Sequence, residues 1–328
     1  MATEIPFVRE LDVTYGEAVQ VSPLIRRIVA DNPSKFTYLG TGTYLVGRGE
    51  VAVIDPGPAL QAHADAILAA LGPDERISHV LITHTHTDHS PGAALLRALG
   101  VAAPTYGHGP HGEVPPDDPG DRVVFDDPEA DGTAESKESR PPKPADELRE
   151  GADTDFVPDV VLGDGDVVSG PGWTIEAVHT PGHTSNHLCF GLAEERALFP
   201  GDHVMGWSTS VIGPPDGDLG QYLDSLRKLL DRDDAVYWPT HGPAITEPHA
   251  HVRAFIAHRE ERLDQIRAAL RPGPATIAEL VPRMYADVAK ALWRPAAATV
   301  YAALLHLAAA GEVQVDGEPR RTATWELC

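Results

Sequence analysis

The chain of 328 residues has 49 acidic residues against 26 lysines and arginines, a formal net charge of -23. Such a charge disfavours general attraction to nucleic-acid backbones and anionic membranes. Its two cysteines, Cys189 and Cys328, give no disulfide framework. Because the chain shows neither a signal peptide nor an uncharged apolar run long enough to cross a bilayer, we expect a cytoplasmic protein that does not bind membranes.

The first part of the chain alternates predicted strands with predicted helices. The segment "YLVGRGEVAVIDPG" predicts a β-hairpin whose second strand ends at Asp55. Ser90 and Pro91 are typical of a helix start, as the N-cap and the first helical residue. After the hairpin we expect a helix over 61–72, a strand over 77–84 and a helix over 90–100. This alternation is typical of an α/β domain.

Residues 111–158 differ in composition from the segments on either side. Acidic residues outnumber basic ones there by about three to one, proline is frequent and apolar periodicity is almost absent. We therefore expect an acidic, proline-rich insertion that is solvated and partly disordered rather than an ordered lid. Strands resume in residues 159–203, separated by turns at 164–165 and 171–172.

The last part of the chain is mainly helical. Apolar periodicity predicts a long helix over 249–270, and Thr276 with Glu279 forms a capping box for the next helix. A further helix over 295–311 and a hairpin over 312–327 complete a small α+β unit of winged-helix type. We place the catalytic domain in residues 1–246, and a helical linker with the winged-helix-like domain in residues 247–328.

The segment "THTHTDH" (83–89) concentrates metal-ligand side chains directly after a predicted strand. His84 and His86 are two residues apart, so on an extended segment both imidazoles point the same way, while Asp88 and His89 can serve a second metal. Zinc takes about four ligands, so others must come from downstream. Three candidates follow predicted strands, each beside glycine or proline: His183, Asp202 and His241.

These seven residues together resemble the signature of the metallo-β-lactamase superfamily. The resemblance implies an α/β fold, namely an αββα sandwich, followed here by the winged-helix-like domain. It implies one metal held by His84, His86 and His183, a second held by Asp88, His89 and His241, and Asp202 as the bridge between them. Asp55 also matches the family and is implied to orient the ligand loop. Segments after Asp202 and the C-terminal domain resemble the lactamase-beta-like branch, which is related to glyoxalase II.

The resemblance implies a hydrolase with two zinc ions per chain, although iron or manganese stays open. A bridging hydroxide would attack the substrate, with Asp88 and Asp202 as the catalytic residues that orient it. The bond cleaved would be an ester, thioester, lactone or phosphodiester bond, in a small-molecule substrate.

Three alternatives stay open. The first is a mononuclear iron dioxygenase acting on persulfides, the second a single-strand endoribonuclease, and the third a nucleic-acid-binding protein with a vestigial site. The negative charge, and the absence of Lys and Arg from "PAAATVYAALLHLAAA", disfavour nucleic acid. For the C-terminal domain we favour a packing, cleft-wall or dimerisation role, so a homodimer stays open.

The other histidines differ in how close they lie to the predicted ligands. His187 and His203 lie near predicted ligands and are candidates for supporting a ligand or contacting substrate, and Trp207 lies on a predicted cleft-facing loop. His108 and His111 border the insertion and are within reach of the cleft. We interpret six further histidines as structural or surface residues: His63, His79, His249, His251, His258 and His306.

Overall fold

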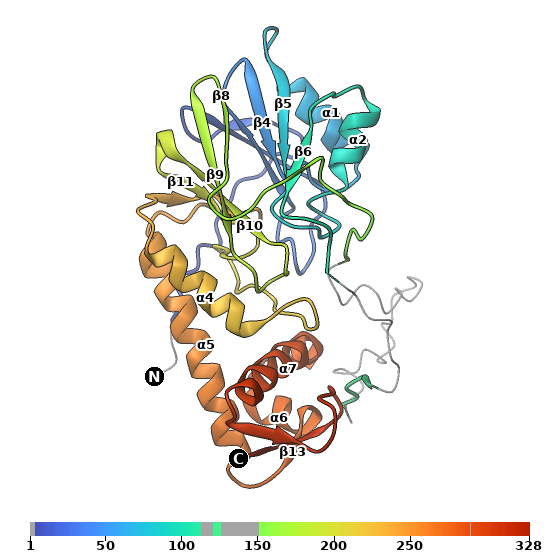
Figure 1. Cartoon of the computed structure of the whole chain (residues 1–328), viewed down its shortest axis with the longest axis vertical. Coiled ribbons are helices and arrows are strands. Elements are labelled where there is room, and N and C mark those ends of the chain that lie inside the picture. The colour runs from blue at the N-terminus through green and yellow to red at the C-terminus, as the bar shows by residue number, and fades with distance from the viewer. Residues whose placement is uncertain (1–3, 113–120, 126–150, 289) are drawn as a thin grey trace.

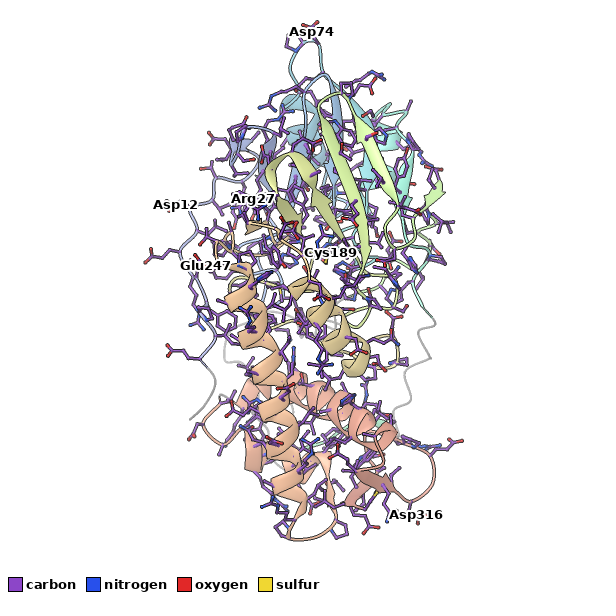
Figure 2. The ribbon with its side chains drawn as sticks, turned by 60° about the vertical axis from the view of Figure 1, so that its left-hand side comes forward. Asp12, Arg27, Asp74, Cys189, Glu247 and Asp316 are labelled. Carbon is purple, nitrogen blue, oxygen red and sulfur yellow. The ribbon has the colours of Figure 1, made fainter. Side chains whose placement is uncertain are left out.

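Two stacked β-sheets form one half of an elongated molecule, and a small, mainly helical domain forms the other half (Figure 1). The computed structural model describes residues 4–112, 121–125, 151–288 and 290–328. Asp74, in the turn before the fifth strand, and Asp316, in the C-terminal hairpin, mark opposite ends of the molecule (Figure 2). In the described part of the chain, no helix has the length and apolar character needed to span a membrane.

The first sheet has seven strands in chain order. The strands from β1 to β4 pair antiparallel and include the predicted hairpin of β3 and β4, whereas those from β4 to β7 pair parallel. Its strands are β1 (Val19–Gln20), β2 (Ile25–Val29), β3 (Gly42–Val46), β4 (Glu50–Ile54), β5 (Arg76–Leu81), β6 (Thr105–Gly107) and β7 (Val160–Val161).

Two helices cover the outer face of this sheet, because the parallel strands need crossovers. α1 (Gln61–Ala69) connects β4 to β5, and α2 (Gly92–Ala98) connects β5 to β6. Both helices are shorter than predicted. Pro91, not Ser90, occupies the N-cap of α2, since the Ser90 hydroxyl donates instead to the carboxylate of Asp153 (2.6 Å).

The second sheet has the strand order β12-β11-β10-β9-β8. The inner faces of the two sheets meet in an apolar layer that includes Tyr44 and Ile54 from the first sheet and Trp173, Phe190 and Phe199 from the second. Its strands are β8 (Val167–Gly170), β9 (Trp173–His179), β10 (Leu188–Leu192), β11 (Ala197–Phe199) and β12 (Val236–Tyr237), with a short 3₁₀ helix at Ala193–Glu195. The αββα sandwich expected from the sequence is confirmed.

The outer face of the second sheet packs on helices that lead into the C-terminal domain. α4 (Leu219–Leu230) and α5 (Pro248–Leu270) lie side by side, and α5 extends from the sandwich into the smaller domain. That domain contains β13 (Ala275–Thr276), α6 (Ile277–Met284), a 3₁₀ helix (Lys290–Leu292), α7 (Trp293–Ala309), β14 (Val313–Val315) and β15 (Thr324–Leu327).

The C-terminal domain has the predicted winged-helix character. The backbone N–H of Thr276 donates to the carboxylate of Glu279 (2.8 Å), so the predicted capping box is present. β14 and β15 form the expected hairpin, and β13 extends it to three strands. One apolar cluster runs from Leu198 of the second sheet through α4 and α5 to Trp325 of β15, so the two halves share a core.

The described parts of the acidic insertion make several specific contacts with the rest of the protein, although Val124 (58% exposed) and Val157 (68% exposed) are solvated as predicted. Phe125 is 4% exposed and packs edge-on against Trp293 of α7, while Asp121 accepts a hydrogen bond from Thr322. At the other end, the carbonyl of Gly151 accepts the backbone N–H of Thr87 (2.8 Å). Residues 113–120 and 126–150 lie outside the described residues.

Buried His63 gives the fold a pH dependence that can be measured. Burial lowers the pKa of His63 to about 4, from 6.5, while its Nε2 lies 2.8 Å from the Thr43 hydroxyl. Between pH 6.5 and 4, His63 is therefore protonated in the unfolded chain but neutral in the folded chain. Protonation favours the unfolded state, so the free energy of unfolding falls as the pH falls from 6.5 toward 4. We expect the advantage of wild type over His63→Gln to shrink by about 2 kcal/mol between pH 7.5 and 5 in urea unfolding. A pH-independent difference would contradict this assignment.

Candidate metal centre

The loop that carries "THTHTDH" is held by the carboxylate of Asp55, which directly follows β4. Asp55 has a positive φ of 48° and is 1% exposed. Its Oδ1 accepts the backbone N–H of Thr83 (2.8 Å), and its Oδ2 accepts the Thr83 hydroxyl (2.7 Å) and the Nδ1–H of His89 (2.9 Å). The hydroxyl of Thr240, next to His241, donates to the same oxygen (3.2 Å). One carboxylate therefore ties both loops to the end of β4.

The imidazoles of His84, His86 and His183 converge. His84 Nε2 lies 2.9 Å from His86 Nδ1, and His183 Nε2 lies 3.1 Å from the same atom. On the outer sides of the rings, His84 Nδ1 lies 3.0 Å from the Thr83 hydroxyl oxygen, and His183 Nδ1 donates to the carbonyl of Val211 (2.6 Å). The Nε2 atoms of His84 and His183 are thus left with lone pairs that face His86.

The remaining four residues of the predicted ligand set form the other half of the cluster. His241 Nε2 lies 3.1 Å from Asp88 Oδ2 and 3.3 Å from Asp202 Oδ2. His89 Nε2 lies 3.4 Å and 3.6 Å from the same two oxygens. The hydroxyl of Thr41, on the loop before β3, donates to Asp88 Oδ2 (2.9 Å) and fixes that carboxylate. All seven predicted residues therefore lie in one cluster.

The donor atoms fit divalent cations. Three overlapping sets have their ligand atoms within 4.8 Å of one another: His84 with His86 and His183, His84 with His89 and Asp202, and Asp88 with His89 and His241. Nitrogens bound to one zinc at about 2.0–2.1 Å with tetrahedral angles would lie about 3.3 Å apart, which is close to the separations observed. Within the described residues, His89 Nε2 and Asp202 Oδ1 are buried without a hydrogen-bond partner, as atoms that bind a metal would be.

The electrostatics of the cluster also favour a cation. Burial, together with the neighbouring imidazoles, holds the pKa of His84 well below 6.5, so the ring is a neutral ligand. Burial disfavours charge on His89 and His241 too, but Asp88 and Asp202 outweigh it, so the pKa of His89 is raised and that of His241 is raised to about 10. A bound cation would replace the protons that these two histidines otherwise hold beside the carboxylates.

His187 and His203 lie next to the cluster in different surroundings. His187 Nε2 accepts the backbone N–H of Asp202 (3.3 Å), and its Nδ1 lies 2.9 Å from the Thr180 hydroxyl, so His187 positions Asp202. The ring of His203 lies 5.7 Å from that of His187 and 4.6 Å from that of Tyr222. Burial lowers the pKa of His203 to about 3, and neither of its ring nitrogens has a hydrogen-bond partner among the described residues.

Two further residues brace the motif: His111, which the sequence predicted to lie within reach of the cleft, and Asn186, which had no distinctive sequence signal. The amide of Asn186 donates to the Thr85 hydroxyl (2.9 Å) and to the carbonyl of Gly109 (3.2 Å), which joins the motif to the segment after β6. His111 Nδ1 lies 3.0 Å from the same hydroxyl, so His111 reaches the motif. His108, the other histidine at the border of the insertion, stacks on His179 instead, with the two ring centres 3.9 Å apart. Only the position of Asn186 between two histidines hinted at its role.

Comparison with known families agrees with this geometry. Residues 38–241 match the model of the metallo-beta-lactamase superfamily, and residues 276–325 match that of the beta-lactamase-associated winged helix domain. The chain belongs to the metallo-beta-lactamase superfamily. The first match contains all seven residues of the cluster, and the second contains α6, α7, β14 and the first half of β15.

Similar proteins include fungal members of the superfamily. The chain is 31% identical to the lactamase-like protein adaB of Aspergillus niger, over 97% of this chain and 94% of that protein. It is 32% identical to an atrochrysone carboxyl ACP thioesterase of Paecilomyces divaricatus, over 80% of this chain and 72% of the relative. A thioesterase of the same name from Claviceps purpurea is 28% identical over 92% of this chain and 84% of its own.

Solved structures of two bacterial proteins share the fold. A metallo-beta-lactamase family protein from Thermus thermophilus aligns with a TM-score of 0.69 and 24% identity, covering 94% of this chain and 100% of its own. A beta-lactamase domain protein from Burkholderia ambifaria aligns with a TM-score of 0.73 and 20% identity, covering 97% of this chain and 96% of its own. Both alignments include the C-terminal domain, so the two-part architecture occurs in other proteins.

The close packing around Gly92 supports the loop that carries "THTHTDH", and a substitution at Gly92 tests how far the loop depends on it. A Cβ at Gly92 would overlap the carbonyl oxygen of Pro56 and lie 2.9 Å from that of Gly57, whose own N–H donates to the carbonyl of His89 (3.1 Å). We expect Gly92→Ala to lower the unfolding free energy by about 1–3 kcal/mol through overpacking, and to lower metal content. Denaturant unfolding and elemental analysis measure both. Gly72→Ala is the control, because its Cβ would meet only ordinary contacts at 3.7 Å; equal losses in both variants would contradict the prediction.

Proposed function

We propose that this protein is a metal-dependent thioesterase. Two zinc ions would supply a hydroxide between them as the nucleophile and would polarise the thioester carbonyl. The observation that carries the proposal is the largely buried cluster of seven ligand-type side chains, in a chain that is 32% identical to a protein named as a thioesterase. This name favours an acyl thioester over the ester, lactone and phosphodiester bonds that the sequence left open.

The proposal gives each residue of the cluster a role. One zinc would be held by His84, His86 and His183, the other by Asp88, His89 and His241, with Asp202 shared between them. Asp88 and Asp202 would also orient the attacking water through hydrogen bonds. Asp55 would keep His89 in the tautomer that presents Nε2 to the metal, because Asp55 accepts the Nδ1 proton.

The alternatives to hydrolysis account for fewer of the observed contacts. An iron dioxygenase needs only two histidines and one carboxylate, which would leave the pairing of His241 with Asp88 and Asp202 without a role. A nucleic-acid-binding role is disfavoured because α7, which would read a groove in a winged helix, contributes Val300, Leu304 and Leu307 to the shared apolar core. We assign residues 247–328 to packing against the catalytic domain, 1–246.

Metal content and a substrate panel test the proposed function. We expect about two zinc ions per chain in protein purified without added metal, and hydrolysis of acyl thioesters in preference to lactones, bis(p-nitrophenyl) phosphate and single-stranded RNA. His84→Ala and Asp202→Asn should each lower kcat/KM by at least about 100-fold, because each removes a ligand of the cluster. Steady-state kinetics with a chromogenic thiol assay measures the loss.

Matched controls come from the same residue types outside the cluster. His306→Gln on α7 and Asp224→Asn on α4, where the Asp224 side chain is 79% exposed, should retain wild-type kinetics. One iron per chain together with oxygen consumption on a persulfide would replace the hydrolase with the dioxygenase. Unchanged activity in both cluster variants would show that the cluster is not the active site.

A further inference from the structure

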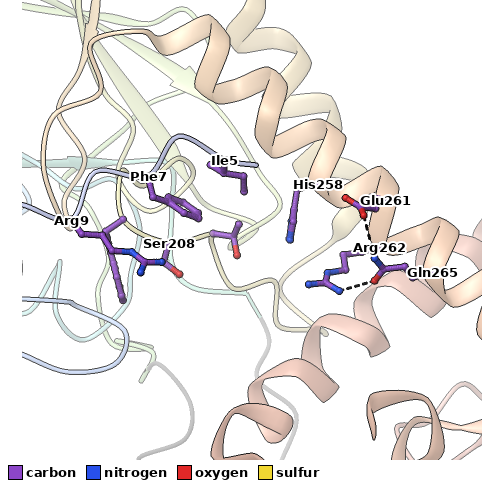
Figure 3. Close-up of a pocket in the computed structure, with 10 residues that line it drawn as sticks. Ile5, Phe7, Arg9, Ser208, His258, Glu261, Arg262 and Gln265 are labelled. Carbon is purple, nitrogen blue, oxygen red and sulfur yellow. Dashed lines mark hydrogen bonds between the residues drawn. The ribbon is translucent and has the colours of Figure 1, made fainter. Parts of the chain in front are cut away.

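A separate cavity of about 370 Å³ lies between the N-terminal segment, the loop after Asp202 and α5 (Figure 3). None of the seven cluster residues lines it. Its volume is within the range of small-molecule sites, about 300–1,000 Å³. The N-terminal segment is fixed over this cavity, because the N–H of Val8 donates to the carbonyl of Gly206 (2.9 Å) and Phe7 packs edge-on against Phe255 of α5.

The ionisable side chains that line the cavity carry a net positive charge, although the protein as a whole is strongly acidic. Arg9 and Arg262 line it together with one acidic residue, Glu261. Gln265 Oε1 accepts a hydrogen bond from Arg262 (2.6 Å), and the Arg262 guanidinium lies 4.7 Å from the centre of the Tyr285 ring, so neither contact neutralises its charge. With a chain charge of -23, a local excess of positive charge is a specific feature rather than a general property of the surface.

The other lining residues suit an anion attached to an apolar or aromatic group. Phe7 and Trp207 supply aromatic surface, and Ser208 supplies a hydroxyl. Burial, with the nearby Arg259 and Arg262, lowers the pKa of His258 to about 4, so His258 is neutral at pH 7 and leaves the positive charge to the arginines. His258, which we interpreted from the sequence as a structural or surface residue, therefore lines a candidate binding site.

One loop connects this cavity to the metal cluster. The loop starts at Asp202, lines the cavity at residues 207–209, and ends near Val211, whose carbonyl accepts the Nδ1–H of His183 (2.6 Å). On its other side, Trp207 touches the loop of His241, because a Cβ on Gly242 would lie 2.8 Å from Trp207 Cδ1. A group bound in the cavity would thus contact the same loop that carries one cluster ligand and positions another.

We propose that this cavity binds an anionic group of the substrate, at a distance from the thioester, through Arg9 and Arg262. This inference rests on the proposed thioesterase function for the identity of the substrate, but not for the binding itself. The anion is a carboxylate on an aromatic acyl group or the phosphate of a phosphopantetheine arm. Both present acceptor oxygens for charge-assisted hydrogen bonds, and because Arg9 and Arg262 lie at opposite sides of the lining (Figure 3), each guanidinium group is a separate candidate donor.

Titration calorimetry on the metal-loaded protein with salicylate and, separately, 4′-phosphopantetheine distinguishes these sources. We expect one probe to bind, and the double variant Arg9→Gln with Arg262→Gln to weaken it by about tenfold or more. Ser208→Glu, which adds a negative charge to the lining, should weaken it as well. Arg253→Gln, an exposed arginine on the same helix, is the control and should leave affinity unchanged.

The outcomes separate this inference from the proposed function. His84→Ala should retain the arginine-dependent binding, since the cavity does not include the cluster. With two aryl thioesters that differ by one distal carboxylate or phosphate, the arginine variants should raise KM about tenfold for the anionic one alone and leave kcat unchanged. Absence of thioesterase activity would remove the function but not the binding site. Binding that is equal in wild type, in the double variant and in Ser208→Glu would overturn the site.

Discussion

The buried carboxylate of Asp55 is the contact on which the metal cluster depends. A carboxylate that is 1% exposed is costly unless its charge is compensated by hydrogen bonds, and Asp55 receives them from Thr83, His89 and Thr240. These donors belong to two loops that are far apart in the chain and contribute five of the seven candidate ligands. The requirement to compensate one charge therefore brings the loops together, and the positive φ of 48° at Asp55 turns the chain sharply away after β4.

A second constraint is the mutual repulsion of the groups that Asp55 assembles. Several neutral imidazoles present lone pairs to one another at about 3 Å, and two carboxylates face the same histidine. Without a cation, protons on His89 and His241 are the remaining means of balancing the charge of Asp88 and Asp202. Binding of a cation and folding of these loops would therefore be thermodynamically coupled, which would explain why several candidate ligands have a positioning hydrogen bond on the opposite ring nitrogen.

The sequence was sufficient for the cluster because its ligands follow local rules. His84 and His86 leave a strand with the same orientation, and Asp202 and His241 follow strands beside glycine or proline, all of which short segments reveal. The supporting contacts are not local. Thr41 reaches Asp88 from another loop, and Asn186 reaches Thr85 from the second sheet, so no spacing within one segment could indicate them. The same reason applies to the insertion, where composition gave no sign that Phe125 packs on Trp293, which is about half the chain length away in sequence.

The charge distribution would allow a very acidic protein to act on the proposed anionic substrate. A net charge of -23 repels polyanions such as RNA at long range, but this repulsion is screened beyond a Debye length of about 8 Å at physiological ionic strength. Within that distance local groups determine the interaction, and each of the two proposed sites would present positive charge, through the metals in one and through Arg9 and Arg262 in the other. A ligand with one or two charges and an apolar body gains from these contacts, whereas a long polyanion must also cover acidic surface. This distribution of charge would favour small acyl substrates over nucleic acid even if the shape of the two sites did not exclude nucleic acid.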